Sequence, residues 1–274
     1  NAPNKSTKIL NGDSSNVLNW DDVRFKWAPP KYKNMLGNFW TPFEINMGPD
    51  IKQWADALSE EEKDTFLKII GLLAFLDSIQ SDYASKVSDY ITDSSVNALL
   101  IILAQQEVIH NHSYSYILSS LVSKQKQDEV FEYWKKDDVL LERNKFIADG
   151  YEDFINNKTP ETVLKSIVYD VILEGLFFYA GFAFFYNLAR NNKMVATSTM
   201  INYINRDENV HVDLFVNIYK EILNDFPHLN TPEFQQWVTE KLKEAALLEI
   251  KWGQHVIGQK FDGIISGVTE WGLY

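Results

Sequence analysis

The sequence Glu-x-x-His occurs twice in this chain, each time inside a long segment with helical periodicity. The first copy pairs Glu107 with His110 and the second pairs Glu208 with His211, and together they use two of the five histidines. Residues three positions apart share one face of an α-helix, so a carboxylate and an imidazole at this spacing can bind one metal ion together. Two such helices that face each other would bind two ions. The doubled motif therefore predicts a helical bundle with a two-metal site.

Both polar pairs interrupt an apolar stripe. Leu103 and Ile117 flank the first pair at helical spacing, and Ile204 and Phe215 flank the second. A single Glu-x-x-His is common on solvated helix surfaces and is weak support for a site. A carboxylate on a face that must be buried, however, is costly unless it has a partner. The position of the two pairs thus favours metal binding over a surface role.

Two further acids stand in apolar surroundings. Asp77 interrupts the apolar row that follows a capping sequence at Ser59, and Glu174 is the only carboxylate in residues 171–186. A membrane span needs roughly 20 mainly apolar residues. A central glutamate would cost roughly 2.5–3.5 kcal/mol in such a span. We therefore interpret residues 171–186 as a core segment around a dry site.

One aspartate, three glutamates and two histidines on four helices make up the predicted ligand set, which is Asp77, Glu107, His110, Glu174, Glu208 and His211. This is the composition of a dimetal carboxylate centre. Its four carboxylates balance the formal charge of two divalent ions. Mixed oxygen and imidazole ligands favour iron or manganese over a structural zinc site, but they do not decide between iron and manganese.

The prolines divide the chain into two parts. We expect an irregular N-terminal arm over residues 1–50 and a single helical domain over residues 51–274, because a boundary between residues 77 and 211 would divide the ligand set. The expected fold class is all-α, with almost no sheet. Helices are predicted near residues 59–87, 93–121, 126–147, 160–190, 194–224 and 231–257.

Charge and cysteine content exclude some functions. The formal net charge of −12 argues against direct binding of nucleic acid, which needs clustered lysine and arginine. The first ten residues contain no apolar signal and the chain has no cysteine, so that we expect a cytoplasmic location and no association with a membrane. Without cysteine, this chain alone performs no thiol chemistry.

Four motifs follow one another in an order that is typical of a known family. They are Leu76-Asp-Ser-Ile-Gln80, Glu107-Val-Ile-His-Asn-His-Ser-Tyr114, Glu174-Gly-Leu-Phe-Phe-Tyr179 and Arg206-Asp-Glu-Asn-Val-His211. With these motifs the chain, from Asn38 onward, resembles the small, radical-generating subunit of class I ribonucleotide reductase. The resemblance implies a ferritin-like helical bundle and an oxidoreductase, ribonucleoside-diphosphate reductase, that contains a dinuclear Fe or Mn centre.

The resemblance also implies a role for each ligand. Asp77, Glu107 and His110 would bind one ion and Glu174, Glu208 and His211 the other, with glutamates as bridges. Tyr114 would carry the radical. Its spacing agrees, because a residue four positions after His110 lies on the same helix face, one turn from the metal ligands.

Further positions match the family. Phe178, Phe182 and Ile204 resemble the apolar pocket that protects the radical. Trp40 and Asp207 resemble parts of an electron route to the partner subunit, and Asp207 would in addition orient His110. The histidines at 112, 228 and 255 match no role in the family and are expected to be surface or satisfied residues.

The implied activity is the oxidation of Tyr114 by the dimetal site and an oxygen species, followed by transfer of the oxidising equivalent to a large subunit that reduces ribonucleotides to deoxyribonucleotides. The implied partners are that large subunit, a second copy in a homodimer and, as an open question, a flavoprotein activator. Family members usually continue past the region of residues 252–257 into a tail with a redox tyrosine, and Tyr274 is not assigned that role.

Two alternatives with the same fold stay open. A ferritin-like dimetal oxidase that binds a small apolar ligand usually lacks a tyrosine at the position of Tyr114. An iron-storage protein would be shorter and would not need Trp40 or the aromatic residues around Glu174.

Overall fold

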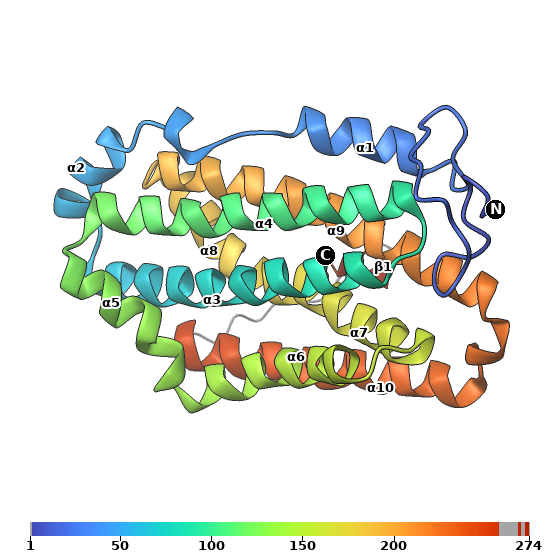
Figure 1. Ribbon diagram of the computed structural model, residues 1–274. Helices are drawn as coiled ribbons and strands as arrows, with labels where there is room; N and C mark the ends of the chain where they lie inside the picture. Colours follow the sequence, from blue (N-terminus) through green and yellow to red (C-terminus); the bar gives the residue numbers. More distant parts are fainter. Residues whose placement is uncertain (1, 258–267, 270–271, 274) are drawn as a thin grey trace.

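The computed structural model describes residues 2–257, 268–269 and 272–273, and helices dominate them (Figure 1). The helices are α1 (Ala28–Gly37), α2 (Gly48–Asp56), α3 (Glu60–Tyr90), α4 (Ser94–Leu121), α5 (Lys124–Glu132), α6 (Asp138–Asn156), α7 (Pro160–Ile172), α8 (Tyr179–Arg190), α9 (Val195–Asp225) and α10 (Pro232–Ile257). Short 3-10 turns lie at Pro42–Glu44, Tyr133–Lys135 and Pro227–Leu229, and a π-helical segment lies at Leu173–Phe177. Two antiparallel strands, β1 (Val268–Thr269) and β2 (Gly272–Leu273), complete the described elements. The all-α prediction is confirmed.

Helices α3 and α4 form an antiparallel pair that runs along the length of the bundle (Figure 1). A capping box begins α3. The Ser59 hydroxyl accepts from the backbone N–H of Glu62 at 3.1 Å, and the Glu62 carboxylate accepts from the backbone N–H of Ser59 at 2.8 Å. The Asp93 carboxylate caps α4 by accepting from the backbone N–H of Ser95 and Val96. These caps fix where each helix begins, and thereby which face of it is buried.

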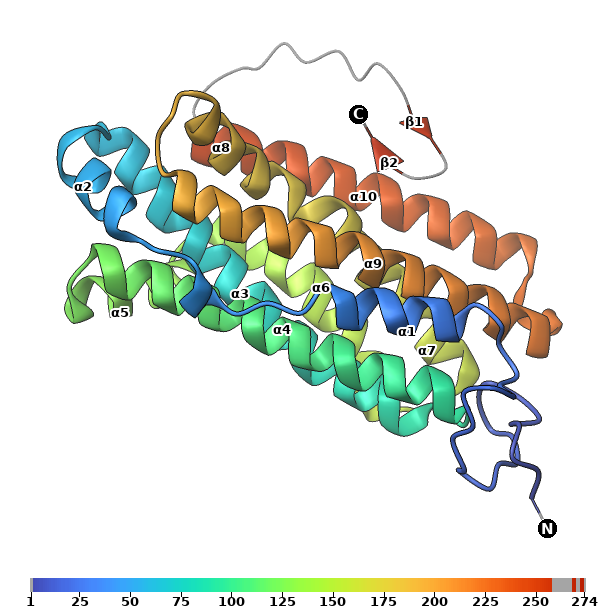
Figure 2. The same ribbon diagram turned by 90° about the horizontal axis from the view of Figure 1, so that it is seen from above.

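The arm at residues 1–50 is not entirely irregular, which corrects that part of the prediction. Pro29 and Pro30 lie in the first turn of α1, where the missing N–H costs nothing and the restricted φ favours a helix. The arm then runs along α4 and α9 (Figure 2). Asp50, at the start of α2, accepts from the backbone N–H of Ala196 at 3.0 Å and of Thr197 at 2.7 Å, so the arm caps α9.

Two predicted helices are interrupted. The expected helix over residues 126–147 is divided at Asp137, whose carboxylate accepts from the backbone N–H of Val139 and Leu140 and begins α6. The expected helix over residues 160–190 changes register at the π segment that contains Glu174. In the first case a local cap competes with helical periodicity, and in the second an extra residue enters the helix.

Among the described residues, Pro160–Arg190 is the one stretch that is long and apolar enough to span a membrane, with a mean hydropathy of 1.6 over its most apolar window. In the structure α7 packs against α6 and α9, and α8 packs against α9. Glu174 in its middle is fully buried among these helices. The stretch is therefore a core element of the bundle.

Candidate metal centre

The six predicted ligands come together in the core, from α3, α4, α9 and the π segment. One group consists of Asp77, Glu107, His110 and Glu208, and the other of Glu107, Glu174, Glu208 and His211. Within each group the potential ligand atoms lie within 4.8 Å of one another, and all of these side chains are buried. Glu107 and Glu208 belong to both groups, so they are placed to bridge two ions.

Both imidazoles direct Nδ1 at the carboxylates. His110 Nδ1 lies 3.3 Å from Glu107 Oε2 and 3.1 Å from Glu208 Oε1. His211 Nδ1 lies 2.9 Å from both Glu107 Oε1 and Glu208 Oε2, and 3.2 Å from Glu174 Oε2. The two rings stack with centroids 5.8 Å apart. Each Glu-x-x-His pair thus points at the space between α4 and α9.

The opposite nitrogen of each ring is held by a different residue. His110 Nε2 lies 3.1 Å from Asp207 Oδ2, and His211 Nε2 lies 3.0 Å from Gln106 Oε1. An acceptor at Nε2 favours the proton at that nitrogen and leaves the Nδ1 lone pair free for a metal ion. The sequence motifs predicted the contact of Asp207, but not that of Gln106.

Several buried polar atoms of the cluster have no hydrogen-bond partner. They include both carboxylate oxygens of Asp77, Glu107 and Glu208, together with His110 Nδ1, although Glu107 and Glu208 lie within ion-pair distance of the two Nδ1 atoms. Carboxylates at zero exposure that outnumber the imidazoles facing them are strongly destabilising unless cations neutralise them. The donor set, four carboxylates and two imidazoles, suits two divalent ions with a preference for mixed oxygen and nitrogen ligands. The residues therefore fit a dinuclear centre.

The pKa shifts describe the same cluster. Burial, and then the charges of Glu107 and Glu208, raise the pKa of the Asp77 carboxyl well above its ordinary value. Burial opposes protonation of His110, but the surrounding carboxylates, Glu208 above all, raise its pKa well above the ordinary value. The cluster thus holds protons when it holds no cation, and metal binding displaces them.

Glu174 is supported by residues that the sequence motifs did not assign. The Gln80 amide donates to the carboxylates of both Glu174 and Asp170, and the Tyr151 hydroxyl donates to Gln80 Oε1 at 2.7 Å. Gln80 ends the motif that begins with Leu76, and Gln106 directly precedes Glu107, so each neighbours a predicted ligand in sequence. Asp170 has no comparable signal beyond its position one turn before Glu174.

Tyr114 is fully buried, and the Asp77 carboxylate lies beside its hydroxyl. Burial, followed by the negative charge of Asp77, raises the pKa of this phenol well above its ordinary value. The predicted pocket residues Phe178, Phe182 and Ile204 are also fully buried. The rings of Phe178 and Phe182 stack with centroids 5.7 Å apart. The structure therefore contains a protonated tyrosine in a dry environment, one helical turn from His110.

Trp40 connects the arm to the metal-binding cluster. Its indole is 4% exposed, and Nε1 donates to Asp207 Oδ2 at 2.9 Å. The same oxygen contacts His110, so a continuous series of hydrogen bonds runs from Trp40 to a ligand. Arg206 donates to Asp207 Oδ1 at 3.2 Å and to the Asn38 carbonyl at 2.6 Å. The arm is thus attached to the residue that orients His110.

The remaining histidines lie outside the cluster, as expected, and all three are exposed. His255 Nε2 lies 2.7 Å from Asp137 Oδ2. The rings of His112 and His228 make edge contacts with Phe43 and Phe226. No metal-binding role follows for any of them.

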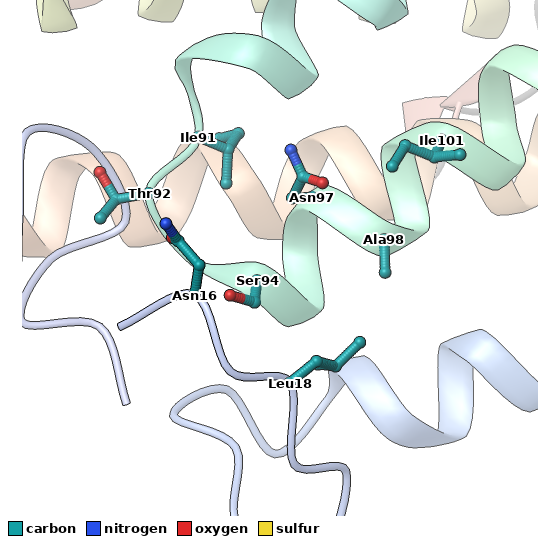
Figure 3. Close-up of a pocket in the computed structure, with 8 residues that line it drawn as sticks. All are labelled: Asn16, Leu18, Ile91, Thr92, Ser94, Asn97, Ala98 and Ile101. Carbon is teal, nitrogen blue, oxygen red and sulfur yellow. The ribbon is translucent and has the colours of Figure 1, made fainter. Parts of the chain in front are cut away.

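A groove of about 390 Å³ lies between the arm and the start of α4 (Figure 3). Its lining consists of Asn16, Leu18, Ile91, Thr92, Ser94, Asn97, Ala98 and Ile101. None of these side chains is titratable and none is a predicted ligand. The groove therefore offers no chemistry comparable to that of the buried cluster.

A four-helix carboxylate cluster with two Glu-x-x-His pairs defines the class of ferritin-like dimetal proteins. The sequence model of "Ribonucleotide reductase, small chain" matches residues 17–270. The chain belongs to this family.

Individual relatives agree with this assignment. The chain is 66% identical over 263 residues to the ribonucleoside-diphosphate reductase subunit beta of Halalkalibacterium halodurans, which covers 96% of this chain and 76% of the relative. The R2 subunit of ribonucleotide reductase from Clostridium botulinum superposes with a TM-score of 0.91 at 42% identity, over 96% of this chain and 83% of that one. The dimanganese(II) NrdF of Streptococcus sanguinis superposes with a TM-score of 0.80 at 25% identity, over 88% and 83%.

Membership in the family settles the choice between the alternatives. The chain is a small chain of class I ribonucleotide reductase and hence part of an oxidoreductase, and the iron-storage alternative is not supported. Small chains of this class have a dinuclear Fe or Mn centre, pair with a large subunit and form dimers. The ferritin-like fold prediction is confirmed.

Proposed function

We propose that Asp77, Glu107, His110, Glu174, Glu208 and His211 bind two metal ions, and that Tyr114 stores a radical generated at this centre. Bound iron or manganese supplies the oxidising power for this reaction together with an oxygen species. The residues of the chain bind and orient the ions, exclude water and hold the phenol proton of Tyr114 until the tyrosine is oxidised. The oxidising equivalent then serves the large subunit in the reduction of ribonucleoside diphosphates.

The burial of Tyr114 beside the cluster is the observation that carries this proposal. A tyrosyl radical persists only where water and reductants do not reach it, and Tyr114 is fully buried, with Asp77 as the polar group beside its hydroxyl. Phe178, Phe182 and Ile204 are apolar and fully buried, so none of them offers a proton or an electron readily.

Trp40 and Asp207 are proposed to conduct the oxidising equivalent between the cluster and the large subunit. The hydrogen bonds from Trp40 Nε1 to Asp207 Oδ2 and from that oxygen to His110 Nε2 support this route. Asp207 also fixes the orientation of the His110 ring, so that one residue serves both metal binding and transfer.

Electron paramagnetic resonance tests the proposal. The protein is loaded anaerobically with Fe(II) and exposed to oxygen, and a tyrosyl signal coupled to a dimetal cluster is expected. Tyr114→Phe should retain the metal content and lose the signal. Tyr116→Phe is the matched control, because Tyr116 lies on the same helix and donates to the Ile45 carbonyl at 3.0 Å instead of facing the cluster. An undiminished radical in Tyr114→Phe contradicts the assignment.

The same measurement addresses the native metal and the activator. Bound iron without a radical would favour manganese, which the Streptococcus sanguinis relative contains, together with a flavoprotein activator. A radical formed from Fe(II) and oxygen alone makes an activator unnecessary. A cytoplasmic location is proposed from the lack of cysteine.

A single helical domain over residues 51–274 is proposed as well. One continuous hydrophobic core supports it, because the ligand helices contribute to that core together; the core extends from Ile9 to Trp252 and thus also contains residues of the arm.

A further inference from the structure

Arg143 on α6 is fully buried, although it is not one of the predicted ligands. The other three arginines of the chain all have some exposed surface. A guanidinium in the core is costly unless charged and aromatic groups replace its hydration. The partners of Arg143 therefore indicate what its burial achieves.

On one side Arg143 is held by α10, which runs beside α6 (Figure 1). Its Nε donates to Glu249 Oε2 at 2.9 Å, and its Nη2 lies 2.8 Å from the same oxygen. The guanidinium also stacks on Trp252, with Cζ 4.9 Å from the ring centroid. Glu249 and Trp252 are three residues apart and so share one face of α10. This face fixes the plane and the direction of the guanidinium.

On the other side Arg143 holds Phe177, the last residue of the π segment. Nη2 donates to the Phe177 carbonyl oxygen, and Cζ lies 4.1 Å above the Phe177 ring. A π segment interrupts regular helical hydrogen bonding, and its backbone depends on contacts from outside the helix. Glu174 lies inside this segment, three residues before Phe177. Arg143 is thus the link between α10 and the backbone that carries Glu174.

An apolar pair of similar volume in place of both Arg143 and Glu249 would stabilise the contact between α6 and α10 about as well, because buried ion pairs contribute little net stability. It would not donate to the Phe177 carbonyl. The contribution that only an arginine makes here is directional, since its planar fork binds Glu249 and the Phe177 carbonyl at the same time.

We propose that Arg143 is a positioning residue for Glu174, and that through Glu249 and Trp252 it couples α10 to the second metal ion. The inference rests on the proposed function, in which Glu174 is a ligand of that ion. Binding of the first ion, through Asp77, Glu107 and His110, depends on the positions of α3 and α4 instead. Loss of Arg143 therefore weakens the binding of the second ion selectively. By reciprocity, metal binding stabilises the docking of α10.

Stepwise anaerobic titration with Mn(II) tests this inference. Calorimetry gives the two affinities, and electron paramagnetic resonance distinguishes an isolated Mn(II) ion from a coupled pair. In Arg143→Met we expect the first ion to bind as in the wild type and the second at least about 10-fold more weakly, the lower end of the effect of residues that support a ligand. Arg143→Lys, which keeps the charge without the fork, should restore part of the loss. Lys145→Met is the matched control, because it removes a cation from the exposed face of α6, where Lys145 pairs with Asp149.

Amide hydrogen exchange supplies a second measurement. Addition of Mn(II) to the wild type should protect α10 around Glu249 and Trp252, and this protection should be smaller in Arg143→Met. A stabilising contact without a positioning role would lower the melting temperature but leave the ratio of the two affinities unchanged.

Each outcome decides between the hypotheses. If a folded Arg143→Met loses affinity for both ions equally, or binds both as the wild type does, the positioning role is overturned while the proposed function stands. Should Arg143→Met fail to fold, Arg143→Lys decides in its place, since it keeps a cation beside Glu249 without the planar fork that reaches the Phe177 carbonyl. A selective loss at the second ion supports the inference, and unchanged affinities overturn it. A wild-type protein that binds no ion overturns both the proposed function and this inference.

Discussion

The two halves of the metal-binding cluster are built in different ways. Around His110, the proposed ligands Asp77 and Glu107 lie on regular helices, α3 and α4, which pack directly against each other. Around His211, the additional proposed ligand Glu174 lies in a π segment that contacts Gln80 and Arg143, residues distant in sequence. One half follows from helical spacing, whereas the other requires tertiary contacts to hold an irregular backbone. We therefore expect variants to affect the two halves unequally.

The largest effect is expected from a residue that belongs to both halves. Glu208→Ala removes a carboxylate from both ligand groups, one of the two carboxylates that both His110 and His211 contact. Both ions should be lost, with affinities reduced by more than about 100-fold, the upper end of the effect of supporting residues. Metal content after desalting measures this loss. Glu240→Ala on the exposed face of α10 is the control, and two ions retained in Glu208→Ala would show that Glu208 is not a bridge.

A matched pair of variants compares the two histidines. Asp207→Ala removes the acceptor at His110 Nε2, and Gln106→Ala removes the one at His211 Nε2. Each should weaken binding of its own ion by roughly 10- to 100-fold. The effect of Asp207→Ala should be the larger, because a carboxylate accepts a stronger hydrogen bond than an amide. Stepwise Mn(II) titration measures both, and identical losses at both ions in either variant would contradict the separation into two halves.

The same difference decides how much the sequence could predict. Helical spacing predicted the two Glu-x-x-His pairs, and carboxylates that interrupt apolar rows predicted Asp77 and Glu174 as ligands; the role of Tyr114 came from the family resemblance, with which its spacing agrees. Asp207 and Trp40 followed from the family resemblance, since 167 residues separate them and no local pattern joins them. Gln80, Gln106 and Arg143 were not assigned, because each acts on a residue of another helix. The break at Asp137 and the π segment were missed because helical periodicity continues across both.

Two glycines at helix contacts provide a test of the scaffold around each half. A Cβ atom on Gly150 of α6 would lie 2.3 Å from the Tyr169 ring on α7, and one on Gly71 of α3 would lie 2.5 Å from the Val130 carbonyl oxygen. Either alanine variant must separate two helices, at a cost of roughly 1–3 kcal/mol. Because α7 leads directly into the π segment, Gly150→Ala should also lower the affinity for the ion at Glu174. Gly71→Ala should lower stability without a selective loss of affinity for that ion. Thermal unfolding and Mn(II) titration together separate the two outcomes.

The smallest effect is expected at Gly175, directly after Glu174. A Cβ atom at this position would meet only Val212 Cγ2, at 3.7 Å, which is an ordinary contact, and the backbone φ of Gly175 is not in the left-handed region. Gly175→Ala should therefore change stability by less than about 1 kcal/mol, with a gain expected because alanine restricts the unfolded chain. The affinity for the second ion should be unchanged, since Arg143 and Gln80 rather than glycine flexibility hold the π segment. A selective loss of that ion in Gly175→Ala would show instead that the segment depends on the glycine, and that the tertiary contacts alone do not position Glu174.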